Sequence, residues 1–419
     1  MSYSKYLKQK EYVNYHRHSH WSNLVTPDTI LQPIDYVNRA LELGHTTVVV
    51  MEHGHTGSMD NILETYDLCQ KHGLKLVVGA ECYYVRDRLE KDKANMHVVI
   101  IALNKRGMKQ LNAVISAANE DGFYYKARID LELAKSLNPE WFIVTSACVA
   151  GIANSEEDII SFKEHFGDNF YLEIQSHDHP VQIKHNELVL QLAEKYQIEL
   201  IHGNDTHYIT EQHRQDRNIF LKGKGMDYGD ETEFEIDYPD YDTILERYRK
   251  QGVIREDLVI RALDVTMRIK DESEWLEFDK EIKMPSLYPD KTHEEKMEIL
   301  SKIVREEFKR QYQGKIRDRH EFDRYCQEIK YELDIIRATR MEDYFILNYH
   351  GIKKGKEYGG ILTRTGRGSG VSFIVNKLLG FTEIDRLQEK IHLYPTRFMS
   401  VSRILETKSL PDKSCRFMK

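Results

Sequence analysis

The sequence is short of the features that mark secreted, membrane-bound or strongly basic proteins. Its five cysteines are odd in number and form no Cys-x-x-Cys pair, which favours free thiols in a reducing compartment over a disulfide framework. No apolar run approaches the length of a membrane span, and the first residues are too polar for a signal peptide, so we expect a cytoplasmic protein. Positive charge is also short, because 60 Lys and Arg stand against 68 Asp and Glu. A polyanionic partner must therefore meet a local basic patch.

The sequence is long and rich in histidine. Its 419 residues, 41% of them hydrophobic, are enough for two or three globular domains, and the 19 histidines call for an explanation. From about residue 12 to residue 208, short apolar runs such as 46–50 and 198–202 alternate with helix-like segments such as 28–43 and 59–71. Buried runs separated by helices indicate parallel strands in βα units.

Residues that bind metals fall at the ends of these predicted strands. His16 and His18 share one face of a short strand, because side chains alternate along a strand with a period of two. The later runs close with Glu52, His53, Glu81, Cys148, Asp205 and His207, whereas His97 stands at the start of its run, so that its placement depends on the preceding loop. Strand ends converge on one face of a parallel α/β barrel, which predicts a single polynuclear metal site. Each position also has a plain alternative, such as a helix-capping carboxylate or a cysteine of the core.

The same positions resemble the motif series of the PHP (polymerase and histidinol phosphatase) domain family. The motifs are His16-x-His18, Glu52-His53-Gly54, Gly79-Ala80-Glu81, His97, Ser146-Ala147-Cys148 and Asp205-x-His207. The resemblance implies a distorted (β/α)7 barrel over residues 1–215, with nine ligands that hold up to three metal ions. The family usually has Asp at the position of Glu52, which puts the geometry of one metal in question. Imidazole, carboxylate and thiolate ligands suit Zn²⁺, Mn²⁺ or Fe²⁺, and metal-dependent phosphoester hydrolysis is the expected chemistry.

The second half predicts a helical extension and linker over residues 216–285 and then a glycine-rich turn. The turn leads from a strand-like pair at 361–362 into an apolar helix at 373–379. Backbone N–H groups freed by glycine, together with a helix N-terminus, favour phosphate, and Arg364 and Arg367 add positive charge. A tight structural turn is the alternative, since the spacing matches neither a Walker nor a Rossmann motif.

The segments 331–336, 343–345 and 366–370 resemble the start of the palm domain of family C, the bacterial replicative DNA polymerase III alpha subunits. In that family a PHP domain precedes the palm. The resemblance implies an incomplete α/β palm over residues 286–419, in which the nucleotide triphosphate is bound by Arg364, Gly366, Arg367, Gly368 and Ser369. The implied partners are DNA, deoxynucleoside triphosphates, and a second polymerase fragment or replisome subunits.

Only Asp412 matches the aspartates with which the family holds its catalytic Mg²⁺ ions. We therefore expect a truncated polymerase, of a phage or plasmid type, that does not synthesise DNA unaided. Three activities remain open: a metal-dependent 3′–5′ exonuclease, a non-catalytic module whose metal site is structural and which binds DNA or a polymerase partner, and a small-molecule phosphatase. The glycine-rich segment argues against the phosphatase, which has no use for it.

Overall fold

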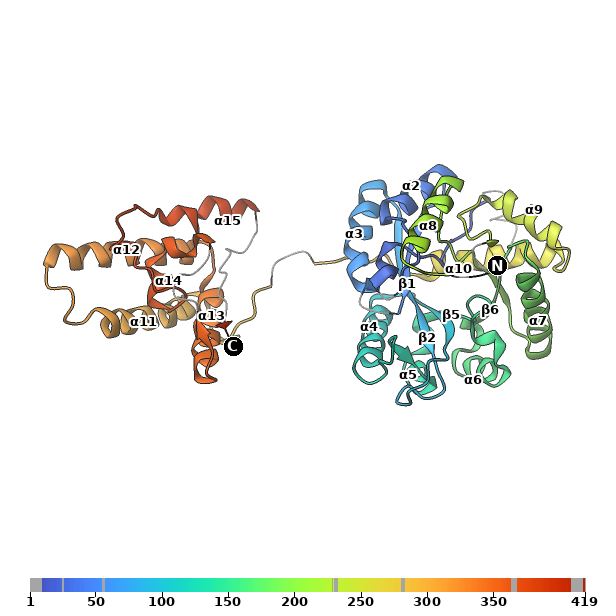
Figure 1. The fold of residues 1–419 in the computed structure, drawn as a ribbon, viewed down its shortest axis with the longest axis horizontal. Helices are drawn as coiled ribbons and strands as arrows, with labels where there is room; N and C mark the ends of the chain where they lie inside the picture. Colours follow the sequence, from blue (N-terminus) through green and yellow to red (C-terminus); the bar gives the residue numbers. More distant parts are fainter. Residues whose placement is uncertain are drawn as a thin grey trace. The chain divides into compact units, whose positions relative to one another are not determined.

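The computed structural model describes residues 10–24, 26–54, 57–227, 229, 233–279, 283–362, 368–407 and 417–418. The chain divides into two compact units, Met1–Phe278 and Asp279–Lys419 (Figure 1). The predicted domain boundaries at residues 215 and 285 stay predictions, and α8, α9 and α10 belong to the first unit. Within the described ranges, no helix is both long enough and apolar enough to cross a membrane.

The first unit is a curled sheet with helices packed around its outside (Figure 1). Its strands are β1 (Thr47–His53), β2 (Lys75–Tyr84), β3 (Met96–Ala102), β4 (Arg128–Ile129), β5 (Phe142–Thr145), β6 (Phe170–Ile174) and β7 (Leu200–His202). Its α-helices are α2 (Pro33–Leu43), α3 (Gly57–His72), α4 (Lys105–Glu120), α5 (Leu131–Lys135), α6 (Glu156–Phe166), α7 (Pro180–Tyr196), α8 (Glu211–Gly223), α9 (Tyr241–Gln251) and α10 (Glu256–Glu272). Within its described residues, short 3-10 helices lie at His20–Leu24, Pro139–Trp141, Ile152–Asn154 and Gly167–Asn169. This arrangement confirms the predicted α/β class.

The strand order is β1-β2-β3-β5-β6-β7, and β4 pairs with β2 away from this path. The β1–β2, β5–β6 and β6–β7 pairs are parallel, as predicted. The prediction of parallel strands is wrong for β3, which runs antiparallel to both β2 and β5. The reversal places the beginning of β3 at the edge of the sheet where β1 and β2 end.

The predicted first strand is an extended segment that closes the curl of the sheet. It forms a single parallel bridge, between Arg17 and Thr206, just after β7. The backbone N–H of His18 donates to the carbonyl of Thr206 at 2.8 Å, and the N–H of Thr206 donates to the carbonyl of His16 at 3.0 Å. The segment that carries the two histidines is therefore fixed beside the segment that carries Asp205 and His207.

Alternation along the strands sorts side chains into two cores. On β1, Val48 and Val50 pack in the core between the sheet and the helices, whereas Val49 and Met51 pack inside the curl. All seven residues of β1 are buried, which is the pattern of a strand covered on both faces. Because β-branched residues fit such a surface, the run Val48–Val50 specifies a strand locally.

The helix predicted over residues 28–43 begins later, at Pro33. Proline suits the first helical turn because its missing N–H has no partner there in any helix. The helix ends at Gly44, whose φ of 70° lies in the left-handed region that glycine adopts without strain. Residues before Pro33 are consequently loop, and they lie near the cluster of candidate ligands described below.

The second unit is mostly helical. It contains α11 (His293–Tyr312), α12 (Arg319–Ala338), α13 (Glu342–Glu357), α14 (Ile374–Leu378), α15 (Val401–Thr407), the short strands β8 (Ile361–Leu362) and β9 (Phe417–Met418), and 3-10 turns at Gly368–Ser372 and Pro395–Arg397. Its core includes Met297 and Leu300 from α11 and Phe345 from α13.

Candidate metal centre

Adjacent strands bring the first set of candidate ligands together. The register pairs His53 at the end of β1 with Glu81 on β2, and pairs Tyr83 on β2 with His97 on β3. All four residues come from the strand positions that face the interior of the curl, because they continue the alternation of its apolar residues. The reversed direction of β3 is what brings His97, at the start of its strand, to the same edge as the others.

Glu81 is the hub of the cluster. Its Oε1 lies 2.7 Å from His97 Nδ1 and 3.4 Å from His16 Nε2. Its Oε2 lies 2.9 Å from His53 Nδ1 and 3.2 Å from His18 Nε2. Each oxygen of one buried carboxylate therefore faces a different pair of imidazoles, which suits a group that bridges neighbouring cations.

Asp205 occupies the other side of the two N-terminal histidines. Its Oδ1 lies 3.3 Å from Nε2 of both His16 and His18, and 3.6 Å from Nδ1 of His207. The residue has a φ of 49°, a left-handed conformation that is costly for a residue with a Cβ. Such conformations persist where the surrounding structure imposes them, commonly at functional sites.

Asp28, which the sequence analysis did not single out, lies in the same cluster. Its Oδ2 is 2.7 Å from His207 Nε2 and 3.4 Å from His53 Nε2, and its Oδ1 pairs with buried Arg217 at 3.2 Å. The signal that was available is Pro33. A proline at the first helical position places Asp28 in the preceding loop, where it cannot serve as a cap of that helix.

Cys148 approaches the cluster from the turn after β5. Its Sγ lies 3.6 Å from Nδ1 of His97, which links it to Glu81 through that imidazole. The preceding residue, Ala147, has a φ of 57°, so the turn that presents the thiol is another place of backbone strain beside the centre.

The structure thus brings together eight of the nine predicted ligands, with Asp28 as an additional ninth candidate. They form four overlapping groups whose ligand atoms lie within 4.8 Å of one another: His16, His18 and Glu81; His18, Asp205 and His207; His18, Asp28 and His53; and Glu81, His97 and Cys148. Within the described residues, several buried ligand atoms lie at ion-pair distance from other members of the cluster but have no hydrogen-bond partner: Nε2 of both His16 and His18, both oxygens of Glu81 and Oδ1 of Asp205. Buried polar atoms are normally satisfied, so these orphaned atoms fit bound cations.

Glu52 is the predicted ligand that lies outside these groups. It precedes the inward-facing histidine of β1 by one residue, and alternation turns it to the opposite face of the strand. Its Oε1 accepts from the Ser19 hydroxyl at 2.7 Å and from Asn61 Nδ2 at 2.6 Å. Its Oε2 accepts from the Ser19 N–H at 2.9 Å and from the Ser22 hydroxyl at 2.6 Å. Ser22 Oγ is also 3.0 Å from Nδ1 of His18, so Glu52 reaches the cluster through a hydroxyl.

A second buried carboxylate, Glu173 on β6, supports the cluster from beneath. Its Oε1 lies 2.7 Å from Nδ1 of His16 and accepts from Gln175 Nε2 at 2.8 Å. Its Oε2 accepts from the hydroxyls of Tyr15 at 2.8 Å and Thr145 at 2.9 Å. A carboxylate that accepts from Nδ1–H leaves the Nε2 lone pair of the histidine for a metal.

The charges of the cluster shift the pKa values of His18 and Glu81 in opposite directions. Burial alone lowers the pKa of His18, but the carboxylates of Glu81 and Asp205 outweigh burial and raise that pKa to about 10. Burial raises the pKa of Glu81, yet the neighbouring imidazoles outweigh it and hold that pKa well below its ordinary value. Because a metal ion binds the neutral imidazole, protons and metal ions compete for these nitrogens.

The glycine-rich segment of the second unit is described only in part. Gly368 and Ser369 lie in a 3-10 turn before α14. Arg364, Gly366, Arg367 and Asp412, which were predicted to bind nucleotide or Mg²⁺, lie outside the described residues.

The N-terminus of α14 is already paired with an anion. The carboxylate of Glu332 accepts from the N–H groups of Ile374 at 2.9 Å and Val375 at 2.8 Å. Arg386 donates to the same carboxylate from Nε at 2.9 Å and from Nη2 at 2.7 Å. These two N–H groups are therefore used inside the protein, and phosphate would have to meet other atoms of the segment.

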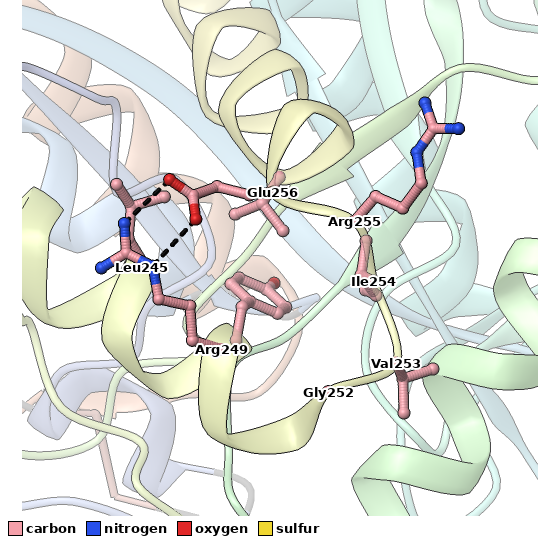
Figure 2. A pocket seen from close by; sticks show the side chains of 9 residues that line it. Leu245, Arg249, Gly252, Val253, Ile254, Arg255 and Glu256 are labelled. Atoms are coloured by element: carbon pink, nitrogen blue, oxygen red, sulfur yellow. Dashed lines mark hydrogen bonds and ion pairs between the residues drawn. The ribbon is translucent and has the colours of Figure 1, made fainter.

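The turn between α9 and α10 borders a surface pocket that holds none of the clustered ligands (Figure 2). Arg249 in this pocket donates to both oxygens of Glu256, at 2.8 Å each. Arg255, which points away from that pair, is bound by Asp257. Both guanidinium groups are thus paired with acids, so the pocket offers no strong attraction for a phosphate.

Comparison with known proteins finds one family model that matches within each unit. Residues 14–177 match the model of the PHP domain, and residues 298–415 match that of the bacterial DNA polymerase III alpha NTPase domain. The DNA polymerase III subunit alpha of Aquifex aeolicus is 27% identical over 437 residues, which cover 96% of this chain and 36% of the relative. The subunit of Borreliella burgdorferi is 28% identical over 429 residues, covering 96% and 35%. The chain spans about a third of the length of these curated relatives.

Similar solved structures include a protein described as a metal-dependent phosphoesterase from Bifidobacterium adolescentis, with 14% identity, a TM-score of 0.34 and coverage of 57% of this chain and 95% of that one. An amidohydrolase from Chromobacterium violaceum has 13% identity, a TM-score of 0.33 and coverage of 57% and 97%. Scores this low leave the assignment to the sequence matches. The chain is therefore similar to a PHP domain over residues 14–177, to a bacterial DNA polymerase III alpha NTPase domain over residues 298–415, and to curated DNA polymerase III alpha subunits over 96% of its length.

Proposed function

We propose that the cluster around Glu81 is a polynuclear metal centre that hydrolyses phosphodiester bonds, acting as a 3′–5′ exonuclease on DNA. The observation that carries the proposal is that, among the described residues, both oxygens of Glu81 and the Nε2 atoms of His16 and His18 are buried within ion-pair distance of one another and have no other hydrogen-bond partner. Zn²⁺ or Mn²⁺ suits this mixture of imidazoles, carboxylates and one thiol.

Divalent ions held there supply Lewis-acid polarisation of a phosphate ester and activation of water. The protein holds the ligand side chains in place and leaves one side of the cluster accessible to the substrate. The side chains of His16 and His18 are at most 1% exposed, whereas those of Asp205 and His97 are 16% and 20% exposed. A substrate therefore reaches the centre past Asp205 and His97.

The test is release of nucleotides from 3′-labelled single-stranded DNA in the presence of Mn²⁺. Wild type should release label, and His16→Ala should release at least tenfold less, because it removes a ligand atom that faces both Glu81 and Asp205. His72→Ala, which changes an exposed histidine at the end of α3, is the matched control and should behave as wild type. Equal release by wild type and His16→Ala would contradict a catalytic centre.

The second candidate is a structural metal site in a module that binds DNA or a polymerase partner. The complete burial of His16 and His18 favours it, because structural sites are closed to solvent. Metal analysis separates the two candidates. A structural site predicts that His16→Ala loses metal and thermal stability while wild type releases no label at all.

The proposal that this chain takes part in DNA synthesis rests only on the proteins to which it is similar. The relatives are named DNA polymerase III subunit alpha as whole proteins, and Mg²⁺, deoxynucleoside triphosphates and DNA are the partners that such an activity requires. Primer extension by the purified chain, with a template and all four triphosphates, tests this part independently of the exonuclease assay.

A further inference from the structure

The loop between α4 and β4 exposes two aromatic rings within three residues of each other. Phe123 is 61% exposed and Tyr125 is 66% exposed. Single apolar side chains on a surface need no explanation, but neighbouring large rings mark a place of contact with another molecule. We call residues 122–126 the aromatic loop.

The aromatic loop lies beside the metal centre. Lys126 Nζ is 3.9 Å from the centroid of the buried Tyr83 ring. The Tyr83 ring stacks on His53 and meets His97 edge-on, with centroids 5.3 Å apart in both cases. These distances bound the separation between the Lys126 ammonium and either imidazole at about 9 Å. A nucleic-acid strand has one phosphate per roughly 3.4 Å of duplex axis, so that distance corresponds to only a few nucleotides.

The backbone of the loop is held in place by a buried guanidinium. Arg128, 2% exposed, donates to the carbonyl of Gly122 at 2.9 Å, of Asp92 at 2.7 Å and of Arg88 at 2.7 Å. Tyr125 at the tip has a φ of 61°, a conformation in which a residue with a side chain is strained. The hydrogen bonds of Arg128 thus fix the conformation of the loop before binding, and such preorganisation lowers the entropy cost of binding.

Two lysines stand over the rings of this neighbourhood. Lys93 Nζ lies 4.1 Å from the centroid of the Tyr125 ring, and Lys126 covers Tyr83. Exposed aromatic rings combined with basic side chains are the means by which proteins hold single strands, through base stacking and phosphate contacts. Since the whole chain has a net charge of −8, stacking rather than bulk charge must carry most of the affinity here.

We propose that the aromatic loop is a docking surface for single-stranded nucleic acid. Bases stack on Phe123 and Tyr125, and the lysines Lys93 and Lys126 meet the phosphates. The statement that this strand is delivered to the metal centre for cleavage rests on the proposed exonuclease function, whereas binding itself does not.

The experiment measures fluorescence anisotropy of a labelled oligothymidylate of about 12 nucleotides titrated with the full chain in EDTA, so that no hydrolysis occurs. A stacked base contributes about 1–3 kcal/mol, and 1.4 kcal/mol corresponds to tenfold, so the double variant Phe123→Ala, Tyr125→Gly should bind at least tenfold more weakly. Glycine is chosen at position 125 because it adopts the positive φ without strain. Phe123→Trp should bind as tightly as wild type or more tightly.

Trp275→Ala is the matched control. Trp275 is 61% exposed and has Lys75 5.8 Å from its ring, but Lys75 begins β2, at the opposite edge of the sheet from Glu81. This variant should keep its affinity within twofold. Unchanged oligothymidylate affinity in the double variant overturns the inference and leaves the loop to a protein partner. Weakened binding in the double variant upholds it even if wild type hydrolyses nothing, in which case only the exonuclease proposal fails.

Discussion

The carboxylate of Glu173 should set the metal affinity of the centre through His16. In Glu173→Gln the amide oxygen can keep the positions facing His16 Nδ1 and Gln175, while the NH₂ group meets the hydroxyls of Tyr15 and Thr145, which can rotate to accept. The substitution therefore preserves shape and hydrogen bonds and removes only the negative charge. We expect a folded protein whose His16 is a poorer ligand.

The size of the effect follows from the kind of partner that is lost. Replacing a partner that hydrogen-bonds a metal-ligating histidine typically costs 10–100-fold in metal affinity, about 1.4–2.7 kcal/mol. Competition between the protein and a chromophoric chelator for Zn²⁺ measures it, with Glu187→Gln on the exposed face of α7 as the control of equal charge. Gly203→Ala perturbs the same carboxylate sterically, because an added Cβ would lie 2.3 Å from Glu173 Oε1. A zinc affinity of Glu173→Gln within twofold of wild type would refute the reasoning.

Three further predictions address neighbouring groups. Glu52→Gln should bind the same number of metal ions as wild type, because Glu52 acts through the Ser22 hydroxyl; loss of one ion by elemental analysis would make it a ligand after all. Cys148→Ser should weaken Zn²⁺ binding more than Mn²⁺ binding, since thiolate favours the softer ion, and equal losses in calorimetric titrations would place the thiol outside the centre. Burial lowers the pKa of His202 to about 4, so the folded protein binds that proton later than the unfolded chain and loses stability as the pH falls from 6.5 to 4, by up to about 3 kcal/mol. Chemical unfolding at pH 7 and pH 5 should show a smaller loss for His202→Gln; an identical loss would exclude this histidine as the cause.

Local pattern was enough to predict most strands of the first unit. The run Val48–Val50, which lies in the apolar run predicted at 46–50, and the run Phe170–Ile174 consist of residues that fit a doubly covered strand. Alternation would also have separated Glu52 from His53, because adjacent strand residues point to opposite faces. The same alternation places His16 and His18, two residues apart, on one face of their segment.

The direction of β3 and the depth of the polar network could not be predicted in the same way. The apolar pattern of a strand is the same whichever direction the strand runs in the sheet, so the sequence around His97 does not distinguish a parallel from an antiparallel arrangement. Glu173 lies in an apolar strand with no neighbouring ligand in sequence, and only the sheet brings it to His16. Asp28 likewise depends on contacts with residues nearly 180 positions away, such as His207.

The most direct test of the account is anomalous scattering from crystals of the full chain grown with Mn²⁺. The account predicts at least two anomalous peaks within bonding reach of Glu81, one of them shared with His16 or His18. A map with no peak near Glu81, or with manganese bound only elsewhere on the chain, would contradict the claim that these residues form one metal centre.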